Sequence, residues 1–306
     1  MAHGVAVAPA AHDDVDDALG PPAVVVRSET GARGGIRRPV GDGGVEPRAG
    51  ADGRHDVGEL TNGAHLRAVF TSYARFDHIV SVSEALRDIN ARSLASWAPA
   101  DKFVAARNTI DVQRVVSGAS EPAPEGTLDA LRPTEDGTRP FVFVSVGRVS
   151  PEKNHARLVE AFQKAQRSRP ELRLVVVGDG PLRAESEALA TRLGLTGLVL
   201  FVGLQRNPWS IMAQSDCFVL SSDYEGQPMV ILEARTLGLP VVSTSFDSVD
   251  SALAPGEGLV VERTVDALAE GMVAAVEGRV PCVDFDAAAY NALVVREFER
   301  AIGAAR

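Results

Sequence analysis

Two glutamates separated by seven residues are the clearest candidates for chemistry in this sequence. Glu225 lies in a loop just before a glycine and a proline, and Glu233 lies about two turns down the helix predicted at residues 229–237. Residues 230–232 are apolar, so the Glu233 carboxylate needs a buried partner, and a sugar hydroxyl pair and an internal arginine are the alternatives. The two carboxylates can therefore contact different parts of one extended ligand.

The start of that helix is a second candidate binding element. Gly226 and Pro228 open the helix. The backbone N–H groups of Gln227, Met229 and Val230 would have no partner within it, because the first turn of a helix leaves its donors unpaired. Such a helix start is an anion site by geometry. These residues are therefore predicted to bind substrate.

A further loop, residues 147–154, carries two fixed positive charges after a predicted strand. Gly147 ends the strand without a side chain, which lets a ligand approach the backbone. The planar guanidinium of Arg148 and the compact ammonium of Lys153 together suit a diphosphate. The alternative is a pair of solvated cations at a helix start. Cations are disfavoured at a helix N-terminus, which favours the binding role.

Two other loops and one histidine are weaker candidates. The glycines at residues 178–181 match part of a dinucleotide-binding fingerprint, but Arg183 stands where its third glycine is needed, so a tight turn is the better interpretation. The loop at residues 203–208 places Arg206 among polar groups that suit a base edge, and a plain turn is the alternative. His155 is interpreted as a surface residue at a helix start, with catalysis as the lesser alternative.

Apolar strands that alternate with helices must position these loops. Strands are predicted at residues 141–146, 172–177, 199–202, 218–220, 241–243 and 259–261, and helices at residues 154–167, 182–193, 209–213, 229–237, 264–277 and 287–302. Strands that are apolar throughout imply an α/β fold, in which helices cover both faces of a parallel sheet. Ligands of such sheets bind at the carboxyl ends of the strands, where the candidate loops lie.

The first part of the chain differs from the rest in composition. Residues 1–62 are rich in Gly, Pro, Asp, Arg and Ala and contain no aromatic residue, so we expect disorder or a misassigned start. One short strand is predicted at residues 24–26, with no visible partner. The divisions expected after it are ordered residues 63–115, a linker at 116–139, a Rossmann-like domain at 140–280 and a C-terminal helix at 281–306.

The bulk composition argues against several classes of function. A formal net charge of -10 disfavours general affinity for nucleic acid or anionic membranes. No apolar run approaches the ~20 residues of a membrane-spanning helix, and the histidines form no pair with zinc-site spacing. Cys217 and Cys282 match no metal-ligand spacing, so Cys217 is expected to be a buried hydrophobe in a reducing cytoplasm.

Taken together, these motifs resemble the retaining glycosyltransferases called group 1, or family 4. The resemblance covers residues 76–261. It is carried by Gly147-Arg148 with Lys153, by residues 176–181, 201–203 and 216–222, and by Glu225-Gly226-Gln227-Pro228 with Glu233-Ala234. It implies the GT-B fold, in which two Rossmann-like domains face each other across the active site.

The resemblance also implies a role for each candidate residue. Arg148 and Lys153 would hold the donor diphosphate in place of a metal ion and stabilise the charge of the leaving group. Glu225 would accept hydrogen bonds from the transferred sugar and Glu233 from the ribose, while the N–H groups of residues 226–230 would bind sugar and phosphate. No cofactor is implied beyond the nucleotide-diphosphate sugar, and the anomeric configuration would be retained.

Residues 65–111 resemble the branch of the family that glycosylates poly(glycerol phosphate) in teichoic-acid-type polymers, and this resemblance suggests the kind of acceptor. A cell-wall polymer or glycan is thus the expected acceptor, and the cytoplasm or the inner face of the membrane the expected location. Residues 63–115 match only the end of the family's first domain, so a truncated acceptor domain is expected. Residues 246–250 replace the usual Gly-Gly loop. An inactive nucleotide-sugar-binding remnant is the alternative function, and another nucleotide enzyme a distant third.

Overall fold

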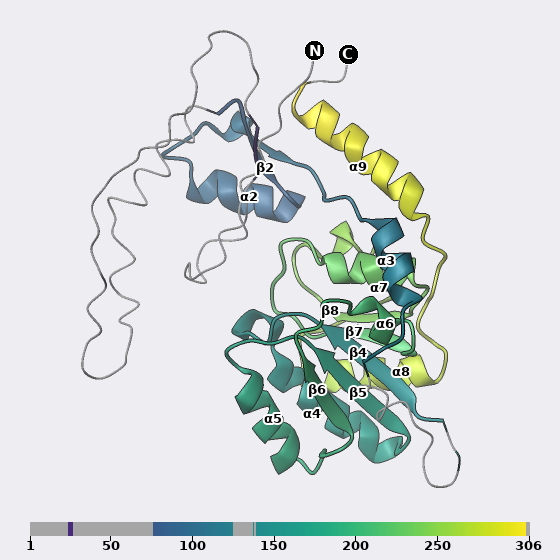
Figure 1. Ribbon diagram of the computed structural model, residues 1–306. Helices are drawn as coiled ribbons and strands as arrows, with labels where there is room; N and C mark the ends of the chain where they lie inside the picture. Colours follow the sequence, from purple (N-terminus) through teal and green to yellow (C-terminus); the bar gives the residue numbers. More distant parts are fainter. Residues whose placement is uncertain (1–23, 27–75, 125–136, 138, 304–306) are drawn as a thin grey trace, which may run out of the picture. The chain divides into compact units, whose positions relative to one another are not determined.

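The computed structural model describes residues 24–26, 76–124, 137 and 139–303, which form two compact units (Figure 1). The smaller unit comprises the described residues up to Ser81 together with Arg87–Ala105. The larger comprises Val82–Leu86 and the chain from Ala106 onward. Residues 1–62, for which disorder or a misassigned start is expected, lie outside the described residues, apart from residues 24–26.

The smaller unit contains a three-stranded sheet with the order β1-β2-β3. Its strands are β1 (Val24–Val26), β2 (His78–Ser81) and β3 (Phe103–Ala105). The strand predicted at residues 24–26 is present, and the partner that the sequence did not reveal is β2, to which it is antiparallel. Ile79 and Phe103 form a small core with Leu94 and Ala98. The last two residues follow helix α2 (Glu84–Ser93).

The larger unit is organised around a six-stranded parallel sheet. Its strands are β4 (Phe141–Val146), β5 (Leu172–Val177), β6 (Val199–Gly203), β7 (Cys217–Leu220), β8 (Val241–Thr244) and β9 (Leu259–Val261). Their order in the sheet is β6-β5-β4-β7-β8-β9. The chain moves outward from β4 to β6 and then returns to β7, on the other side of β4. This reversal is the topological switch point, where doubly wound sheets bind their ligands.

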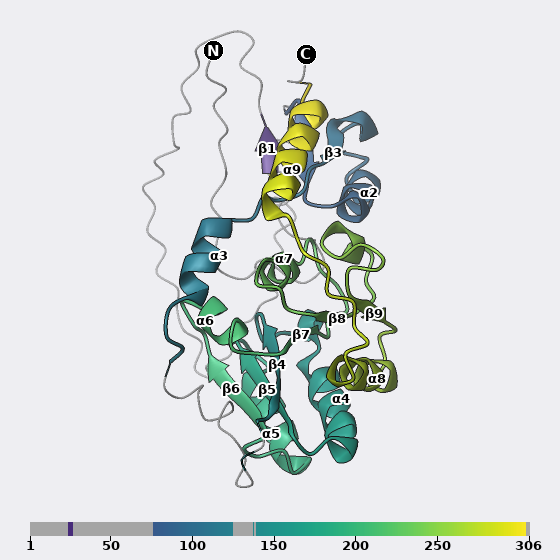
Figure 2. The ribbon, with the colours of Figure 1, turned by 90° about the vertical axis from the view of Figure 1, so that its right-hand side faces the viewer.

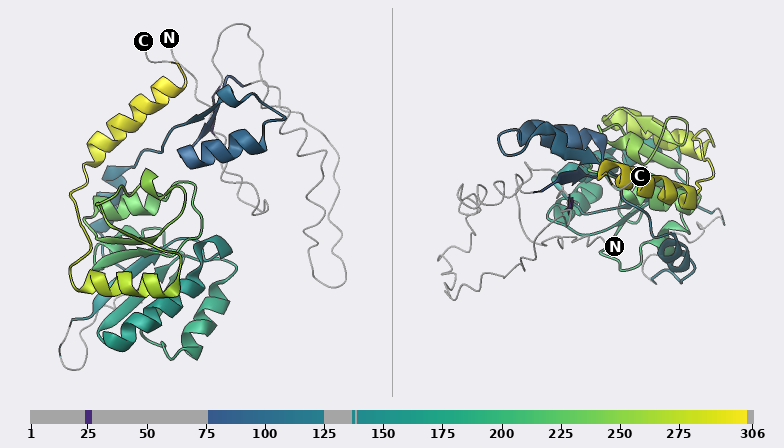
Figure 3. Two further views of the ribbon diagram at one scale, coloured as in Figure 1. Left: turned by 180° about the vertical axis from the view of Figure 1, so that it is seen from behind. Right: turned by 90° about the horizontal axis from the view of Figure 1, so that it is seen from above.

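Helices cover both faces of this sheet (Figures 2 and 3). They are α3 (Val112–Ala119), α4 (His155–Ser168), α5 (Arg183–Arg192), α6 (Trp209–Met212), α7 (Met229–Thr236) and α8 (Val265–Val276). The last helix, α9 (Ala287–Ala301), extends away from this sheet (Figure 1). The core against α4, α5 and α8 includes Phe143, and the core against α3, α6 and α7 includes Val142 and Val144. Alternate residues of one strand thus supply both cores, which is why the strands are apolar throughout. The predicted fold class is confirmed.

Helix α3 lies where the sequence predicted the beginning of a linker. Asp111 caps this helix by accepting a hydrogen bond from Arg114 N–H, and Val115 is buried beneath it. Gly118 lets the helix approach its neighbour closely, since a Cβ here would lie 2.6 Å from a Trp209 ring atom. Glycine and serine suggested a linker, but at this position glycine serves packing against α6.

Both cysteines of the chain are free thiols, and Cys217 is fully buried. Burial raises the pKa of the Cys217 thiol well above its usual range, so the residue is an inert part of the core, as predicted. Across the described residues, we find no helix with the length and apolar character needed to cross a membrane.

Candidate functional site

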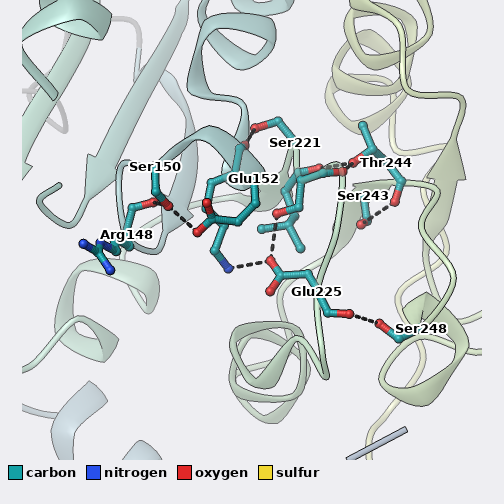
Figure 4. Close-up of polar contacts among 11 residues, drawn as sticks. Arg148, Ser150, Glu152, Ser221, Glu225, Ser243, Thr244 and Ser248 are labelled. Carbon is teal, nitrogen blue, oxygen red and sulfur yellow. Dashed lines mark hydrogen bonds and ion pairs between the residues drawn. The ribbon is translucent and has the colours of Figure 1, made fainter. Parts of the chain in front are cut away.

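Opposite charges from two loops meet at the switch point of the large sheet. The Lys153 ammonium, from the loop after β4, lies 2.5 Å from a carboxylate oxygen of Glu225, from the loop after β7. The Lys153 side chain is 18% exposed and that of Glu225 is 10% exposed, so both are largely shielded from solvent. Ser222 donates a hydrogen bond to the same Glu225 oxygen at 2.7 Å. Figure 4 shows Glu225 held between these contacts.

Further contacts fix the two loops against each other. Ser221 donates from its hydroxyl to the Lys153 carbonyl at 2.7 Å. The backbone N–H of Asp223 donates to the Glu152 carbonyl at 2.8 Å, and the Asp223 carboxylate pairs with Arg157 of α4 at 2.6 Å. The position of the Lys153 ammonium relative to Glu225 is therefore set by backbone as well as by charge.

Asn154 joins the loop after β4 to helix α4. It has a φ of 45°, in the left-handed region that asparagine tolerates better than most residues. Its side chain accepts from Arg157 N–H, which caps α4, and donates to Asp223 at 2.9 Å. Sequence reasoning assigned no separate role in the site to five residues: Asn154, Arg157, Ser221, Ser222 and Asp223. An asparagine at the first position of the helix predicted at residues 154–167 was the one available signal.

Arg148, the other cation of the loop after β4, differs from Lys153 in its surroundings. Its side chain is exposed, and within the described parts of the chain no residue forms a hydrogen bond or ion pair with it. In Figure 4 its guanidinium extends away from Glu225. Gly147 lies beside the other cation, since a Cβ on it would lie 3.6 Å from the Lys153 side chain. The loop thus offers one unpaired cation and one cation already paired with a carboxylate.

The loop at residues 225–230 is anchored through its backbone. Ser248 donates from its hydroxyl to the Glu225 carbonyl at 2.6 Å. Met229 N–H donates to the Gln227 carbonyl at 2.9 Å, so this predicted ligand donor is occupied, because the chain closes a tight turn before α7. The N–H groups of Gly226 and Gln227 have no acceptor among the described residues. Ser248 belongs to the segment that replaces the Gly-Gly loop, and its anchoring role was not predicted.

Glu233 is a half-buried carboxylate in α7. Burial raises its pKa, while Trp209 and the positive charge of Arg114 act in the opposite direction. Arg235 pairs instead with Glu257 at 2.6 Å, and no ion pair to Glu233 occurs within the part of the chain that the structure describes. Arg235 is therefore not the partner of Glu233, while Arg114 is the arginine whose charge acts on the Glu233 carboxylate.

The two weaker loops differ in their relation to this site. Gly178 has a φ of 143°, and a Cβ on it would lie 1.8 Å from the Gly147 carbonyl oxygen. Its loop is thus a tight turn packed against the backbone of the cationic loop, in agreement with the interpretation from sequence. Arg206 is exposed in the loop after β6, the edge strand, and β5 separates that strand from β4. The structure therefore places Arg206 apart from the Lys153–Glu225 pair.

The prediction that His155 is a surface residue is wrong. It is 4% exposed, because the first turn of α4 turns it into the protein rather than toward solvent. Burial lowers its pKa to about 4, the Lys153 charge adds to this effect, and Glu152 opposes it. No described group pairs with its Nδ1 atom. A neutral, packed imidazole is the resulting state.

A comparison with protein-family models matches residues 131–292 to the family described as glycosyl transferases group 1. This match covers more than half of the 306 residues. It includes both loops of the Lys153–Glu225 pair and all of α7.

Curated relatives match a shorter part of the chain. An uncharacterized glycosyltransferase of Methanocaldococcus jannaschii is 38% identical over 104 residues, which is 34% of this chain and 26% of the relative. A 4-alpha-N-acetylgalactosaminyltransferase of Campylobacter jejuni that acts on a diphospho-undecaprenol saccharide is 37% identical over 106 residues, 35% of this chain and 28% of the enzyme. The chain thus matches about a quarter of the length of these relatives.

Solved structures support the fold over more of the chain. Anabaena HepE in complex with UDP and glucose has a TM-score of 0.61 at 21% identity, covering 79% of this chain and 67% of that one. A mutant of S. aureus TarM in complex with UDP, α-GlcNAc-glycerol and Fondaparinux has a TM-score of 0.59 at 14% identity, covering 78% and 46%. At these identities the likeness concerns the fold alone.

Proposed function

The chain belongs to the family of group 1 glycosyl transferases, and from this premise we propose that it transfers a sugar from a nucleoside-diphosphate sugar to an acceptor hydroxyl. The observation that carries the proposal is the Lys153–Glu225 pair at the switch point of the sheet. A cation for the diphosphate and a carboxylate for the sugar hydroxyls stand side by side there. A donor that carries both groups would separate the pair and give each charge a new partner.

The other charged residues extend this assignment along the donor. Arg148 has no side-chain partner among the residues that the structure describes, so we assign its guanidinium fork to the diphosphate and to the charge that develops on the leaving group. The open N–H groups of Gly226 and Gln227 add donors beside Glu225. Glu233, with no ion pair among described residues, would accept from the ribose hydroxyls. Arg206 would contact the donor only if the donor extends as far as the loop after β6, the edge strand.

The reaction details follow the family resemblance. We propose retention of the anomeric configuration and stabilisation of the diphosphate by Arg148 and Lys153 without a metal ion. For the acceptor we propose a cell-wall polymer or glycan. The support is indirect: one structure of similar fold holds UDP with α-GlcNAc-glycerol, and the Campylobacter relative is named for a substrate on diphospho-undecaprenol. A lipid-carried acceptor would place the enzyme at the inner face of the membrane.

The first experiment is calorimetric titration of the full chain with UDP- and GDP-sugars in the presence of a chelator. We expect saturable binding of one of these donors, with a Kd that does not change when the chelator is left out. Absence of binding to every donor would contradict the proposed function, and binding that the chelator abolishes would contradict metal independence.

Turnover is tested separately with the donor that binds. Incubation with a radiolabelled sugar donor and either glycerol phosphate oligomers or lipid-linked saccharides should release nucleoside diphosphate together with labelled product. Nuclear magnetic resonance of the product then gives the anomeric configuration. If the chain binds the donor but releases no nucleoside diphosphate, either with an acceptor or with water alone, the alternative of an inactive binding module would be favoured.

A further inference from the structure

Gln227 stands two residues after Glu225 in the same loop, and its side chain is engaged within the protein. The residue is 8% exposed. Its carboxamide oxygen accepts from the Asn108 N–H at 2.7 Å, and its carboxamide nitrogen donates to the Tyr290 hydroxyl at 2.8 Å. The Tyr290 hydroxyl in turn donates to the Asn108 carbonyl at 3.2 Å. Three residues far apart in sequence thus form a closed ring of hydrogen bonds.

Independent contacts hold the two outer members of this ring. Ile110 and Asn291 exchange two hydrogen bonds, at 2.9 and 2.8 Å, which join the segment at residues 106–111 to α9. Arg107 forms a two-pronged contact with Glu297, at 3.0 and 2.6 Å, and lies 5.4 Å from the centre of the Tyr290 ring. Asn108 and Tyr290 are therefore fixed whether or not Gln227 is present.

The chemistry of the ring requires an amide at position 227. An amide both donates and accepts at the end of a side chain, whereas a carboxylate only accepts and an apolar side chain does neither. Loss of the amide would leave the partly buried N–H of Asn108 without its acceptor and the partly buried hydroxyl of Tyr290 without its donor, which is unfavourable. Pro228 follows at once, with its φ fixed by the ring of the side chain. A displacement of Gln227 would thus be transmitted along a stiff backbone to the start of α7.

The loop is also held on its other side, where Ser248 donates to the Glu225 carbonyl. The loop is thus held at the Glu225 carbonyl and at the Gln227 side chain, with Gly226 between them. We propose that Gln227 and Tyr290 are positioning residues, through which α9 and the 106–111 segment set the placement of Glu225 and of the Gly226 and Gln227 N–H groups. This inference rests on the proposed function for its catalytic meaning, and on the ring of hydrogen bonds for its geometry.

The test compares Tyr290→Phe and Gln227→Met, singly and combined, with Glu297→Gln as the matched control. The control weakens the tie between α9 and the 106–111 segment without touching Gln227. Each of Tyr290→Phe and Gln227→Met removes two of the three hydrogen bonds of the ring. We expect each to raise the Kd of the donor sugar nucleotide by roughly three- to tenfold, with the double variant no worse than Gln227→Met alone.

The readouts separate positioning from general stability. The free nucleoside diphosphate, which lacks the sugar that Glu225 would bind, should lose less affinity than the sugar nucleotide, and kcat should fall more than in the control at equal thermal stability. Hydrogen exchange of the Met229 N–H, which donates to the Gln227 carbonyl, should speed up in both ring variants and stay unchanged in Glu297→Gln. Equal effects of all three substitutions, or unchanged exchange at Met229, would overturn the inference.

Failure of the proposed function would look different. A wild-type chain that binds no sugar nucleotide would remove the donor assignment, while the exchange measurement would still decide whether Tyr290 and Gln227 position the loop. A wild-type chain that binds donor, with ring variants that match the control, would leave the function intact and remove the positioning role.

Discussion

The loops after β4 and β5 both contain glycines and charged residues, yet the glycines have different structural roles in the two loops. In the loop after β5, a Cβ on Gly178 would lie 1.8 Å from the Gly147 carbonyl oxygen, and one on Gly180 would lie 2.4 Å from the Val149 carbonyl oxygen. In the loop after β4, a Cβ on Gly147 would meet only the flexible Lys153 side chain, at 3.6 Å. The first set of glycines supports backbone packing, while Gly147 keeps space beside a cation.

The glycines of the loop after β5 are explained by backbone packing against the loop after β4. The loop after β5 acts as a base on which the cationic loop rests, through the hydrogen bond from Val149 N–H to the Asp179 carbonyl at 2.9 Å. The charges that suit a ligand lie in the supported loop. Substitutions in the two loops should therefore affect different properties.

The largest effect is expected from Gly178→Ala. The added methyl group would overlap the Gly147 carbonyl, and a φ of 143° is unfavourable for alanine, so the free energy of unfolding should fall by at least about 3 kcal/mol. Urea denaturation measures it. Gly147→Ala is the matched control and should cost less than about 1 kcal/mol. Comparable losses for the two variants would remove the distinction between the loops.

The next effect is a pH dependence that arises at His155, where the cationic loop enters α4. The pKa falls from 6.5 to about 4 on folding, so the unfolded chain binds a proton that the folded chain does not. Stability from this residue is complete above pH 6.5 and declines by about 3 kcal/mol as the pH falls toward 4. Denaturation across this range should show a shallower pH slope for His155→Leu. An unchanged slope would contradict the burial of a neutral imidazole.

A smaller effect, confined to binding, is expected from the two cations. Arg148→Ala and Lys153→Ala should each weaken nucleoside diphosphate by roughly 1.5–3 kcal/mol, as for a charged hydrogen bond, and should leave free nucleoside unaffected. Lys153→Ala should have the greater effect, because it leaves the Glu225 carboxylate facing the phosphates unpaired. Calorimetry with both ligands measures this. Equal losses for nucleoside and diphosphate would remove the assignment of these charges.

Glu225, the partner of Lys153, offers a control in which the affinity for nucleoside diphosphate should rise. Glu225→Gln should tighten binding of a nucleoside diphosphate that lacks a sugar, because Lys153 is released, and should weaken binding of the sugar nucleotide. A parallel change for both ligands would show that the ion pair is not separated by the donor.

The smallest effect is expected from Ser248→Ala. It removes the hydrogen bond to the Glu225 carbonyl, and the loss of one neutral hydrogen bond costs about 1 kcal/mol. Denaturation gives the change in stability. Ser251→Ala is a nearby control, since the Ser251 hydroxyl donates to the Ser248 carbonyl and not to residues 225–230. Donor affinity should fall in Ser248→Ala and not in Ser251→Ala, and an equal loss in the two variants would argue against the anchoring role of Ser248.

Most of the large sheet could be predicted from sequence because burial on both faces makes its strands uniformly apolar. The strands at residues 141–146 and 172–177 have the predicted bounds. Helix α3 was missed because Gly118 and its serine neighbours are typical of linkers, and only the position of Trp209 shows why glycine is needed there. The pairing of β1 with β2 depends on residues more than fifty positions apart, which no local pattern reveals.

The candidate site was predictable in its charges and not in its contacts. The rule that ligands bind at strand carboxyl ends located Lys153 and Glu225 correctly near each other. It could not show that the two residues are paired, because a sequence pattern does not give the distance between side chains of the loops after β4 and β7. Asp223, Ser248 and Tyr290 were missed for the same reason. His155 was misjudged because a polar residue at a helix start is more often exposed.

The hydrogen bonds between Ile110 and Asn291 join residues 181 positions apart in the chain. Contacts of such long sequence separation carry a large loop-closure entropy and are expected to form late in folding, after the local strands and helices of the sheet. The sheet would thus assemble first, with residues 225–230 not yet fixed from the side of α9. Binding competence would then appear in a slower kinetic step than secondary structure, and local opening of α9 could remove it while the sheet stays folded.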